Sequence, residues 1–273
     1  MGGKLSLLSH ETSSSIRLWF NILFNRDSSS SVRVSKPKAE PKRVFGVSLQ
    51  TLRKNGMMIH GIPLVLRDMV EFLEKHGMHC HGLFQMGGSV VKIHQLRWRL
   101  DHGERVKMEQ EQVSTVASLL KLFFQQLPDP IIPECQRKSL VECFRGNTDD
   151  AHLNMSLKKH LCRIPDDNLT ILLYIANFLS RVAACSQLNH MTVDSLATIF
   201  GPCLFHVPAG SKMLEEQNVC NIVLVHLFRK HKILPLAPAP SRPPSPTPTT
   251  ETGAFPWTTG RPYCLHSSST HKQ

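Results

Sequence analysis

The sequence predicts an all-α domain of about eight helices between two disordered tails. Apolar residues recur at helical spacing through most of residues 44–234. No window in that region sustains the alternation of apolar and polar residues that is typical of a strand. Residues 1–43 are rich in serine and basic residues, and residues 235–273 begin with a proline-rich run, so neither segment has the composition of a packed core.

The clearest helix is expected over residues 62–77. Its apolar residues follow the spacing i, i+3, i+4, i+7 (Leu66, Met69, Val70 and Leu73). Pro63 suits a first helical turn, because the proline ring fixes φ and the nitrogen there needs no helical partner. Gly77 is a natural helix end.

Further helices are expected along the same region. One spans residues 89–103, with Ser89 as its N-cap, and another runs from Ser114 to a terminating Pro128. The segment 166–183 is apolar on most sides and therefore predicts a central helix. Two more helices are predicted over residues 193–202 and 218–232.

Charge and cysteine usage limit the class of protein. The chain has 273 residues and a formal net charge of +11, which favours anionic partners without choosing among an acidic protein, a membrane and a nucleic acid. Its eight cysteines are scattered and form no C-x-x-C pair, which is typical of free thiols in a reducing compartment. We therefore expect a cytoplasmic protein.

Five segments, in this order, resemble those of the RhoGAP domain, which binds Rho-family GTPases and speeds GTP hydrolysis. They are FGVSL, GIPLVLRDMVEFLEKHG, GLFQMGGSV, VASLLKLFFQQLPDPIIP and MTVDSLATIFGPCLF, and together they cover roughly Phe45 to Leu234. The resemblance implies a RhoGAP-type helical fold, a GTP-bound Rho-family GTPase as partner and no cofactor.

The third segment resembles the loop that carries the family's catalytic arginine finger, and in this chain the finger position is Gln85. An arginine supplied there neutralises negative charge that builds on the phosphate oxygens and raises the rate by about 10³–10⁵. A glutamine amide donates a hydrogen bond but carries no charge. No residue of this chain is therefore expected to be catalytic.

Other positions depart from the family as well. The family's lysine is present as Lys121, but the arginine that braces the finger loop is replaced by Gln125, and the asparagine that contacts the GTPase is replaced by Cys203. These losses imply a GTPase-activating-type regulator, rather than an enzyme itself, that binds a Rho-type GTPase with absent or weak stimulation.

The surface expected to bind an acidic GTPase comprises Lys121, the three departing positions (Gln85, Gln125 and Cys203) and the basic helix over residues 89–103. That helix carries four basic or aromatic residues (Lys92, Arg97, Trp98 and Arg99). The alternative interpretation is that the basic residues of this helix only face solvent, while Trp98 lies in the core.

Three alternative functions remain. In the first, the chain is a working GTPase-activating protein that uses a displaced cation such as Lys92 or Arg97. In the second, it is an interaction scaffold at membranes with no GTPase partner. The third alternative is a nucleic-acid binder, which we disfavour because part of the excess charge lies in the tails and aromatic residues do not interleave with it.

The N-terminal segment predicts membrane association. Its first residues, MGGKLS, match the N-myristoylation pattern at Gly2 and Ser6. One myristoyl chain binds membranes only marginally, so a second contact is needed. The basic run over residues 36–43 and an apolar face over residues 16–24 would supply it, whereas the alternatives are an unmodified tail or a mitochondrial presequence.

Two further motifs are weaker. The C-terminal tail contains overlapping P-x-x-P beside Arg242, which suits an SH3-type partner. The segment HGMHCHG, residues 76–82, groups His76, His79, Cys80 and His81. No second ligand pair accompanies it, so we expect no metal site.

Overall fold

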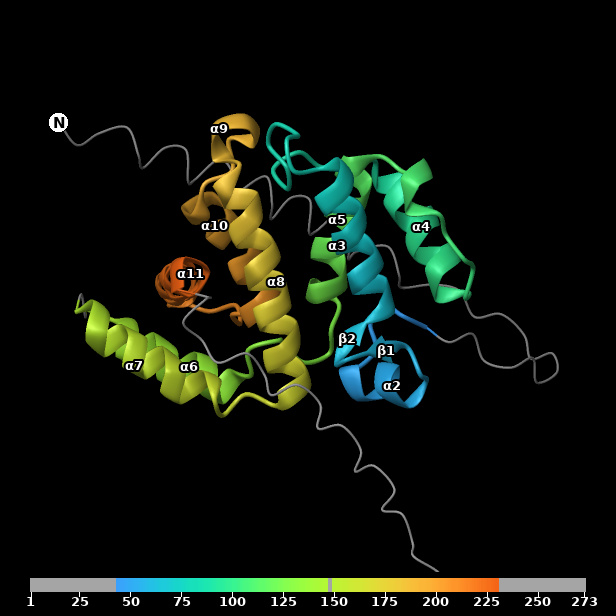
Figure 1. The fold of residues 1–273 in the computed structure, drawn as a ribbon. Coiled ribbons are helices and arrows are strands. Elements are labelled where there is room, and N and C mark those ends of the chain that lie inside the picture. The colour runs from blue at the N-terminus through green and yellow to red at the C-terminus, as the bar shows by residue number, and fades with distance from the viewer. Residues whose placement is uncertain (1–42, 147–148, 231–273) are drawn as a thin grey trace, which may run out of the picture. The chain divides into compact units, whose positions relative to one another are not determined.

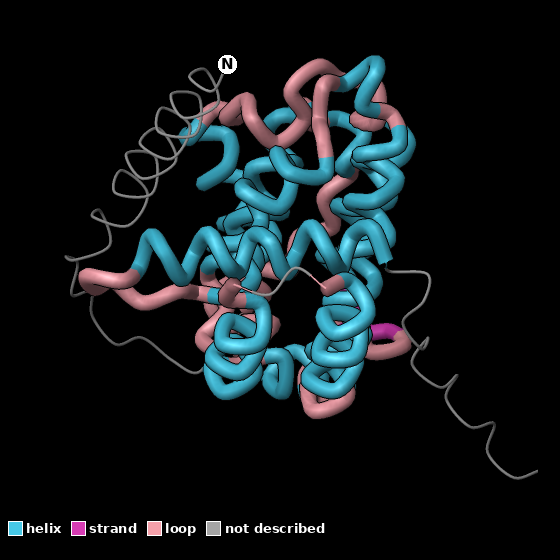
Figure 2. Tube along the Cα trace, turned by 90° about the vertical axis from the view of Figure 1, so that its left-hand side faces the viewer, coloured by secondary structure: helices cyan, strands magenta, loops and turns pink. Residues whose placement is uncertain are grey.

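The structure is a computed structural model that describes residues 43–146 and 149–230. The described residues form ten α-helices, one short 3₁₀ helix and one two-stranded hairpin. Figure 1 shows their arrangement, and Figure 2 shows that helices make up most of the described chain. The prediction of an all-α domain is confirmed. Eight of the helices have 11 or more residues, and the two short ones are α2 and α9.

The first half of the domain contains the hairpin and the helices around it. The elements are α2 (Leu49–Lys54), β1 (Met58–Ile59), β2 (Ile62–Pro63), α3 (Leu64–His76), α4 (Val90–Asp101), η1 (Met108–Gln110) and α5 (Val113–Gln125). The strands pair antiparallel, with Met58 opposite Pro63. Two-residue strands are too short to produce an alternating pattern, so the sequence did not predict them. Pro63, which was predicted to lie in the first helical turn, belongs to β2 and is the N-cap residue of α3.

The second half consists of helices only. They are α6 (Glu134–Phe144), α7 (Asp150–Leu161), α8 (Asp166–Ala184), α9 (Ser186–Asn189), α10 (Val193–Phe205) and α11 (Met213–Lys230). Helices α6 and α7, which pack against each other, had no specific prediction. Ser89 occupies the N-cap position of α4, as predicted, although its side chain makes no capping hydrogen bond.

The core lies around α5, α8 and α10. The whole stretch Thr115–Phe124 of α5 is buried, and α8 buries seven side chains, as expected for a central helix. In Figure 1, α8 runs between α11 on one side and α3 with α5 on the other. Helix α10 packs against α5, α8 and α11. These contacts bring together α5 and α10, which carry two of the segments that resemble the RhoGAP domain.

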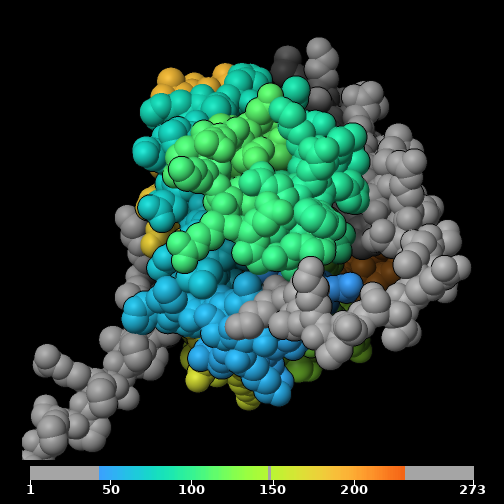
Figure 3. All heavy atoms as spheres, turned by 90° about the vertical axis from the view of Figure 1, so that its right-hand side faces the viewer, coloured from blue at the N-terminus to red at the C-terminus, as the bar shows by residue number. Residues whose placement is uncertain are grey.

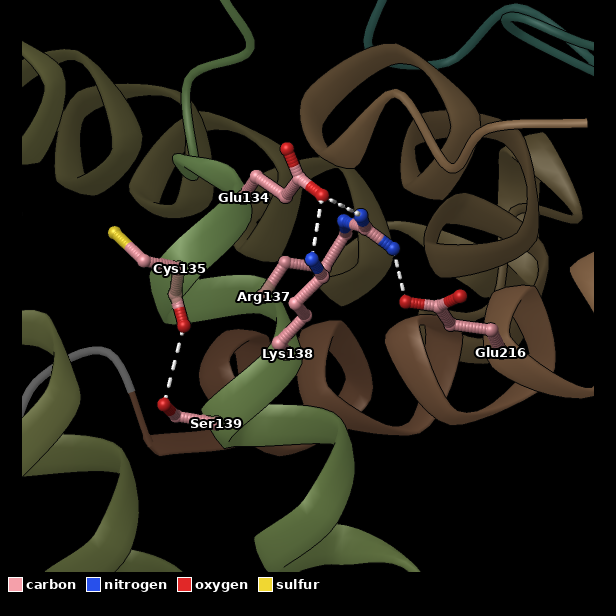
Figure 4. Close-up of polar contacts among 6 residues, drawn as sticks. All are labelled: Glu134, Cys135, Arg137, Lys138, Ser139 and Glu216. Atoms are coloured by element: carbon pink, nitrogen blue, oxygen red, sulfur yellow. Dashed lines mark hydrogen bonds and ion pairs between the residues drawn. The ribbon is translucent and has the colours of Figure 1, made fainter.

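A buried arginine joins α6 to α11. The side chain of Arg137 is 3% exposed and donates from Nη1 to Glu216 Oε1, while its Nη2 lies 3.6 Å from Glu134 Oε1. Figure 4 shows the guanidinium between these two carboxylates, with Lys138 also paired to Glu134. A buried guanidinium is stable only when it is paired, so this contact fixes α11 against α6.

Because two histidines are buried, we expect the domain to lose stability in acid. His160 on α7 lies 3.7 Å from the Cys143 thiol, and His226 on α11 lies 2.7 Å from Asn154 Oδ1. Burial lowers the pKa of both imidazoles, and Asp150 opposes this at His226. The unfolded chain therefore binds more protons just below the ordinary histidine pKa of about 6.5. Stability should be full above that pH and fall as the pH decreases below it.

The measurement is the melting temperature of the full chain across neutral and mildly acidic pH. The His160→Gln/His226→Gln variant serves as the control, since it cannot gain these two protons. Its melting temperature should depend less on pH in this range. An equally steep dependence in the variant would contradict the assignment to these histidines.

No helix among the described residues combines the length and apolarity needed to cross a bilayer. The predicted domain boundaries at 43/44 and 234/235 remain predictions. Gly2, the basic run over residues 36–42 and the proline-rich tail with Arg242 lie outside the described residues.

Candidate functional site

The loop Gly82–Gly88, which we call the finger loop, joins α3 to α4 and is fixed at both ends. The Gly82 amide donates to the Asn189 carbonyl over 2.8 Å, and the Gly88 amide donates to Ser118 Oγ over 3.0 Å. A Cβ at Gly88 would lie 2.6 Å from Thr115 Cα, so the backbone can pass α5 this closely only as glycine. The loop is therefore held against α5 and α9.

The middle of the loop is held by Phe84 and Lys121. Phe84 has a φ of 76°, in the left-handed region, which costs a bulky residue about 1–3 kcal/mol. Its ring is 2% exposed and packs edge-to-face on Phe200 at 5.0 Å and Phe178 at 6.2 Å. Lys121 Nζ donates to the Phe84 carbonyl over 2.7 Å. Burial offsets the backbone strain, and the next residue, Gln85, is exposed at the loop surface.

Lys121 supports the loop from inside the domain. It is 9% exposed, and burial lowers the pKa of its ammonium, an effect that Cys203 opposes. The sequence had assigned Lys121 to the GTPase-binding surface and loop support to the position of Gln125. In the structure it is Lys121 that reaches the loop, across 37 positions of sequence.

Gln125 and Cys203 lie together beside Lys121. Gln125 Nε2 donates to Cys203 Sγ over 3.3 Å, while Gln125 Oε1 is buried without a hydrogen-bond partner. Cys203 is 1% exposed, and its thiol also donates to the Ile199 carbonyl. Burial raises the pKa of this thiol to about 11, so it stays protonated at neutral pH. Cys203 therefore offers almost no surface for contact with a partner.

The two displaced cations differ in their surroundings. Both lie on α4, which begins two residues after the finger loop. Lys92 is exposed in the first turn of that helix. Arg97 Nε lies 3.6 Å from Asp101 Oδ2, and its side chain is 25% exposed. Lys92 is thus the more accessible of the two.

Trp98, also on α4, is 57% exposed. The alternative interpretation that placed it in the core is therefore wrong. The helical period puts Ile93 and Leu96 toward α5, and Trp98 falls on the opposite side.

Sequence reasoning missed Asn189. This residue is fully buried, and its amide nitrogen donates to the carbonyls of Met78 and Val182 over 2.8 and 2.9 Å. Its Oδ1 accepts from the Met191 amide. Asn189 therefore connects the end of α8 to the base of the finger loop. A single polar residue just before a family-like segment gives no periodic pattern that would have revealed it.

The histidine-rich segment next to the loop shows no metal-binding geometry. The rings of His81 and His190 lie 4.5 Å apart, at the surface. Within residues 43–146 and 149–230, no group of three or more His, Cys, Asp or Glu side chains is placed to hold a metal ion.

Comparison with known proteins agrees with this fold. The sequence profile of the RhoGAP domain matches residues 63–209. Rho GTPase-activating protein 22 of mouse is 33% identical over 196 residues, which is 70% of this chain and 28% of that protein. Rho GTPase-activating protein 25 of human is 33% identical over 179 residues, 64% of this chain and 28% of that protein. This chain thus spans little more than a quarter of either relative.

The fold also matches solved structures. The crystal structure of human Rho GTPase activating protein 15 superimposes with a TM-score of 0.66 at 20% identity, covering 72% of this chain and 98% of that one. The BH domain from GRAF, the GTPase regulator associated with focal adhesion kinase, gives a TM-score of 0.58 at 23% identity, with 62% and 91% covered.

One expectation from the sequence is wrong: that the chain stands outside the catalysis-stimulating class. Its relatives are named Rho GTPase-activating proteins, and nothing in the comparisons shows a loss of that activity. That expectation rested on three departures from the family pattern (Gln85, Gln125 and Cys203), whereas hydrogen bonds from Lys121 to Phe84 and from Gly88 to Ser118 still hold the loop. The chain belongs to the RhoGAP domain family.

Proposed function

We propose that this chain binds a GTP-bound Rho-type GTPase through the surface around the finger loop and stimulates GTP hydrolysis weakly. The observation that carries the proposal is the fixed loop that presents the exposed Gln85 amide where the family resemblance places the finger arginine. The partner belongs to the same class as the partners of its relatives. Rate and partner are both properties of the intact protein, and each needs a direct measurement.

The size of the effect follows from charge. An arginine finger contributes about 10³–10⁵ in rate because it neutralises developing phosphate charge. A hydrogen bond from an uncharged amide to a charged phosphate oxygen contributes about 1.5–3 kcal/mol, and only the part gained in the transition state raises the rate, by about tenfold for each 1.4 kcal/mol. We therefore expect stimulation of about tenfold at saturating protein.

The test is single-turnover GTP hydrolysis by Rho-, Rac- and Cdc42-type GTPases, with and without the full chain. Binding is measured separately with the same GTPases loaded with a non-hydrolysable GTP analogue. Binding with weak stimulation that Gln85→Ala abolishes supports the proposal. Binding to none of the GTPases would instead favour an interaction scaffold at membranes. Stimulation of about 10³ or more would contradict the assigned role of Gln85.

A second candidate is a fully active GTPase-activating protein that uses a displaced cation. The exposure of Lys92 near the finger loop favours it, whereas Arg97 is engaged by Asp101. In this case Lys92→Gln would abolish strong stimulation and Gln85→Ala would leave it intact. The two variants therefore separate the candidates.

We also propose that Gly2 carries a myristoyl group and that the basic run over residues 36–43 adds an attraction to anionic lipid. Gly2→Ala should then release the protein into the soluble fraction, because the basic run alone is too weak at physiological salt. The measurement is fractionation of cells that express the full chain, with a myristate analogue to label the modification.

Gly3→Ala is the matched control, since the third position of the myristoylation pattern is unconstrained. It should leave both labelling and membrane association unchanged. Membrane association of Gly2→Ala equal to that of the parent would contradict the proposal. A partner with an SH3-type domain at the proline-rich tail beside Arg242 is a further proposal, which rests on the tail's P-x-x-P pattern alone.

A further inference from the structure

The outer face of α4 is apolar at its centre and exposed to solvent. Four residues lie along it at helical spacing, and all are exposed (Val91, Gln95, Trp98 and His102). Val91 is 64% exposed and Trp98 is 57% exposed. Helix α4 lies at one edge of the domain in Figure 1, and that edge faces the viewer in Figure 3. Helix α5 packs on the opposite side of α4, so among the described residues no helix covers this face.

The tryptophan on this face is held in place. Its ring stacks on the His102 imidazole, with centroids 4.0 Å apart and planes at 28°. The imidazole is fixed in turn, because His102 Nδ1 lies 2.7 Å from the Trp98 carbonyl. A tryptophan with a restrained ring loses little conformational freedom on binding. Its apolar body and polar N–H suit the boundary between water and lipid.

Charge around the face favours an anionic partner. Helix α4 carries three basic residues, of which Lys92 is exposed beside Val91. Arg97 pairs with Asp101, while Arg99 pairs with Glu104 and Glu111 outside the helix. The uncompensated charge of the helix is therefore positive and lies next to the apolar residues.

The first described residues contact the same helix. The amides of Val44 and Phe45 both donate to Asp101 Oδ1, over 2.8 and 2.9 Å. Asp101 is the last residue of α4 and lies one position from His102. The described residues therefore begin, at the basic Arg43, beside the C-terminal end of α4.

We propose that the outer face of α4, with Trp98 at its centre, is a contact surface for a membrane leaflet rich in anionic lipid. Trp98 and Val91 enter the headgroup region, and Lys92 reaches the lipid phosphates from beside them. Arg43, which precedes Val44 at the end of the helix, adds attraction to the same leaflet. This contact goes beyond GTPase regulation and does not involve Gln85, so it is tested independently of the role proposed for Gln85.

The direct test uses the fluorescence of Trp98 in the full chain. The sequence has three tryptophans, so Trp19→Phe/Trp257→Phe leaves Trp98 as the only one. Vesicles of phosphatidylcholine and phosphatidylserine should shift its emission to shorter wavelength, and brominated lipid should quench it. Vesicles of phosphatidylcholine alone should do neither. Vesicle binding with no change in Trp98 emission would overturn the proposal, since the N-terminal segment alone would then make the contact.

A second measurement quantifies the contribution of the face. Trp98→Ala should weaken binding of the full chain to the anionic vesicles by about tenfold, because a large apolar side chain no longer enters the interface. Met155→Ala on α7 is the matched control: Met155 is 66% exposed and lies on a different helix, so binding should not change. Equal losses in both variants would overturn the proposal.

The competing occupant is the GTPase. If the GTPase binds this face, a Rho-type GTPase loaded with a GTP analogue should change Trp98 emission in the absence of vesicles. That result, together with unchanged emission on anionic vesicles, would assign the face to a protein partner and overturn the membrane contact.

Discussion

Gln85→Arg should increase the single-turnover rate of GTP hydrolysis by about 10²-fold, below the 10³–10⁵ of a complete arginine finger. The loop that carries Gln85 is already fixed through Gly82, Phe84 and Gly88, and the Gln85 side chain is exposed. An arginine there therefore requires no rearrangement of the fold. The gain remains incomplete because a guanidinium without a side-chain brace loses conformational freedom in the transition state.

Gln85→Lys is the matched control. Lysine supplies the charge but cannot form two parallel hydrogen bonds to phosphate oxygens, so its effect should be clearly smaller. Equal rates for the two variants would show that charge alone limits the reaction. A rate for Gln85→Arg no higher than that of the parent, with GTPase binding intact, would contradict the assignment of Gln85 to the finger position.

Adding Gln125→Arg and Cys203→Asn to Gln85→Arg should raise the rate further, and by more than the product of the separate effects. Gln125 and Cys203 are in contact at 3.3 Å, and substitutions at residues in contact are coupled. Cys203 is buried, so each single replacement disturbs its neighbour, whereas the pair restores a polar arrangement beside the loop. A triple variant that neither binds a Rho-type GTPase nor accelerates hydrolysis would mean that the binding surface itself has diverged.

Arg137→Ala should lower the free energy of unfolding by about 3 kcal/mol, at the lower end of the range for breaking a buried ion pair. The change leaves Glu216, whose side chain is 21% exposed, without its partner, and it also opens a cavity between α6 and α11. We place the value at the lower end because Glu216 keeps some contact with solvent. Urea unfolding of the full chain gives the measurement.

Two variants test the cause of this loss. Lys138→Ala removes a neighbouring cation whose side chain is 67% exposed, so its stability should stay close to that of the parent. Arg137→Met/Glu216→Leu replaces both charges by apolar side chains and should recover much of the loss, because neither charge then remains buried. If Arg137→Ala were as stable as Lys138→Ala, the ion pair would have no structural role.

The sequence by itself determined the class of the fold and the place of the finger loop. Helical periodicity is a local property, so the bounds of α3, α4 and α8 lie within two residues of those predicted. The position of Gln85 followed from the order of family-like segments. From the sequence we also predicted that an uncharged amide, Gln85, lies at the family's finger position.

Tertiary structure decided which residues hold that loop and which face solvent. Lys121 meets the Phe84 carbonyl, and Asn189 meets the Gly82 amide, although each pair is far apart in the chain. Cys203 is buried beneath Gln125, while Trp98 is exposed. Such contacts depend on how α5, α9 and α10 pack around one core. Periodicity reports which face of a helix is apolar, but not which distant backbone group that face will meet.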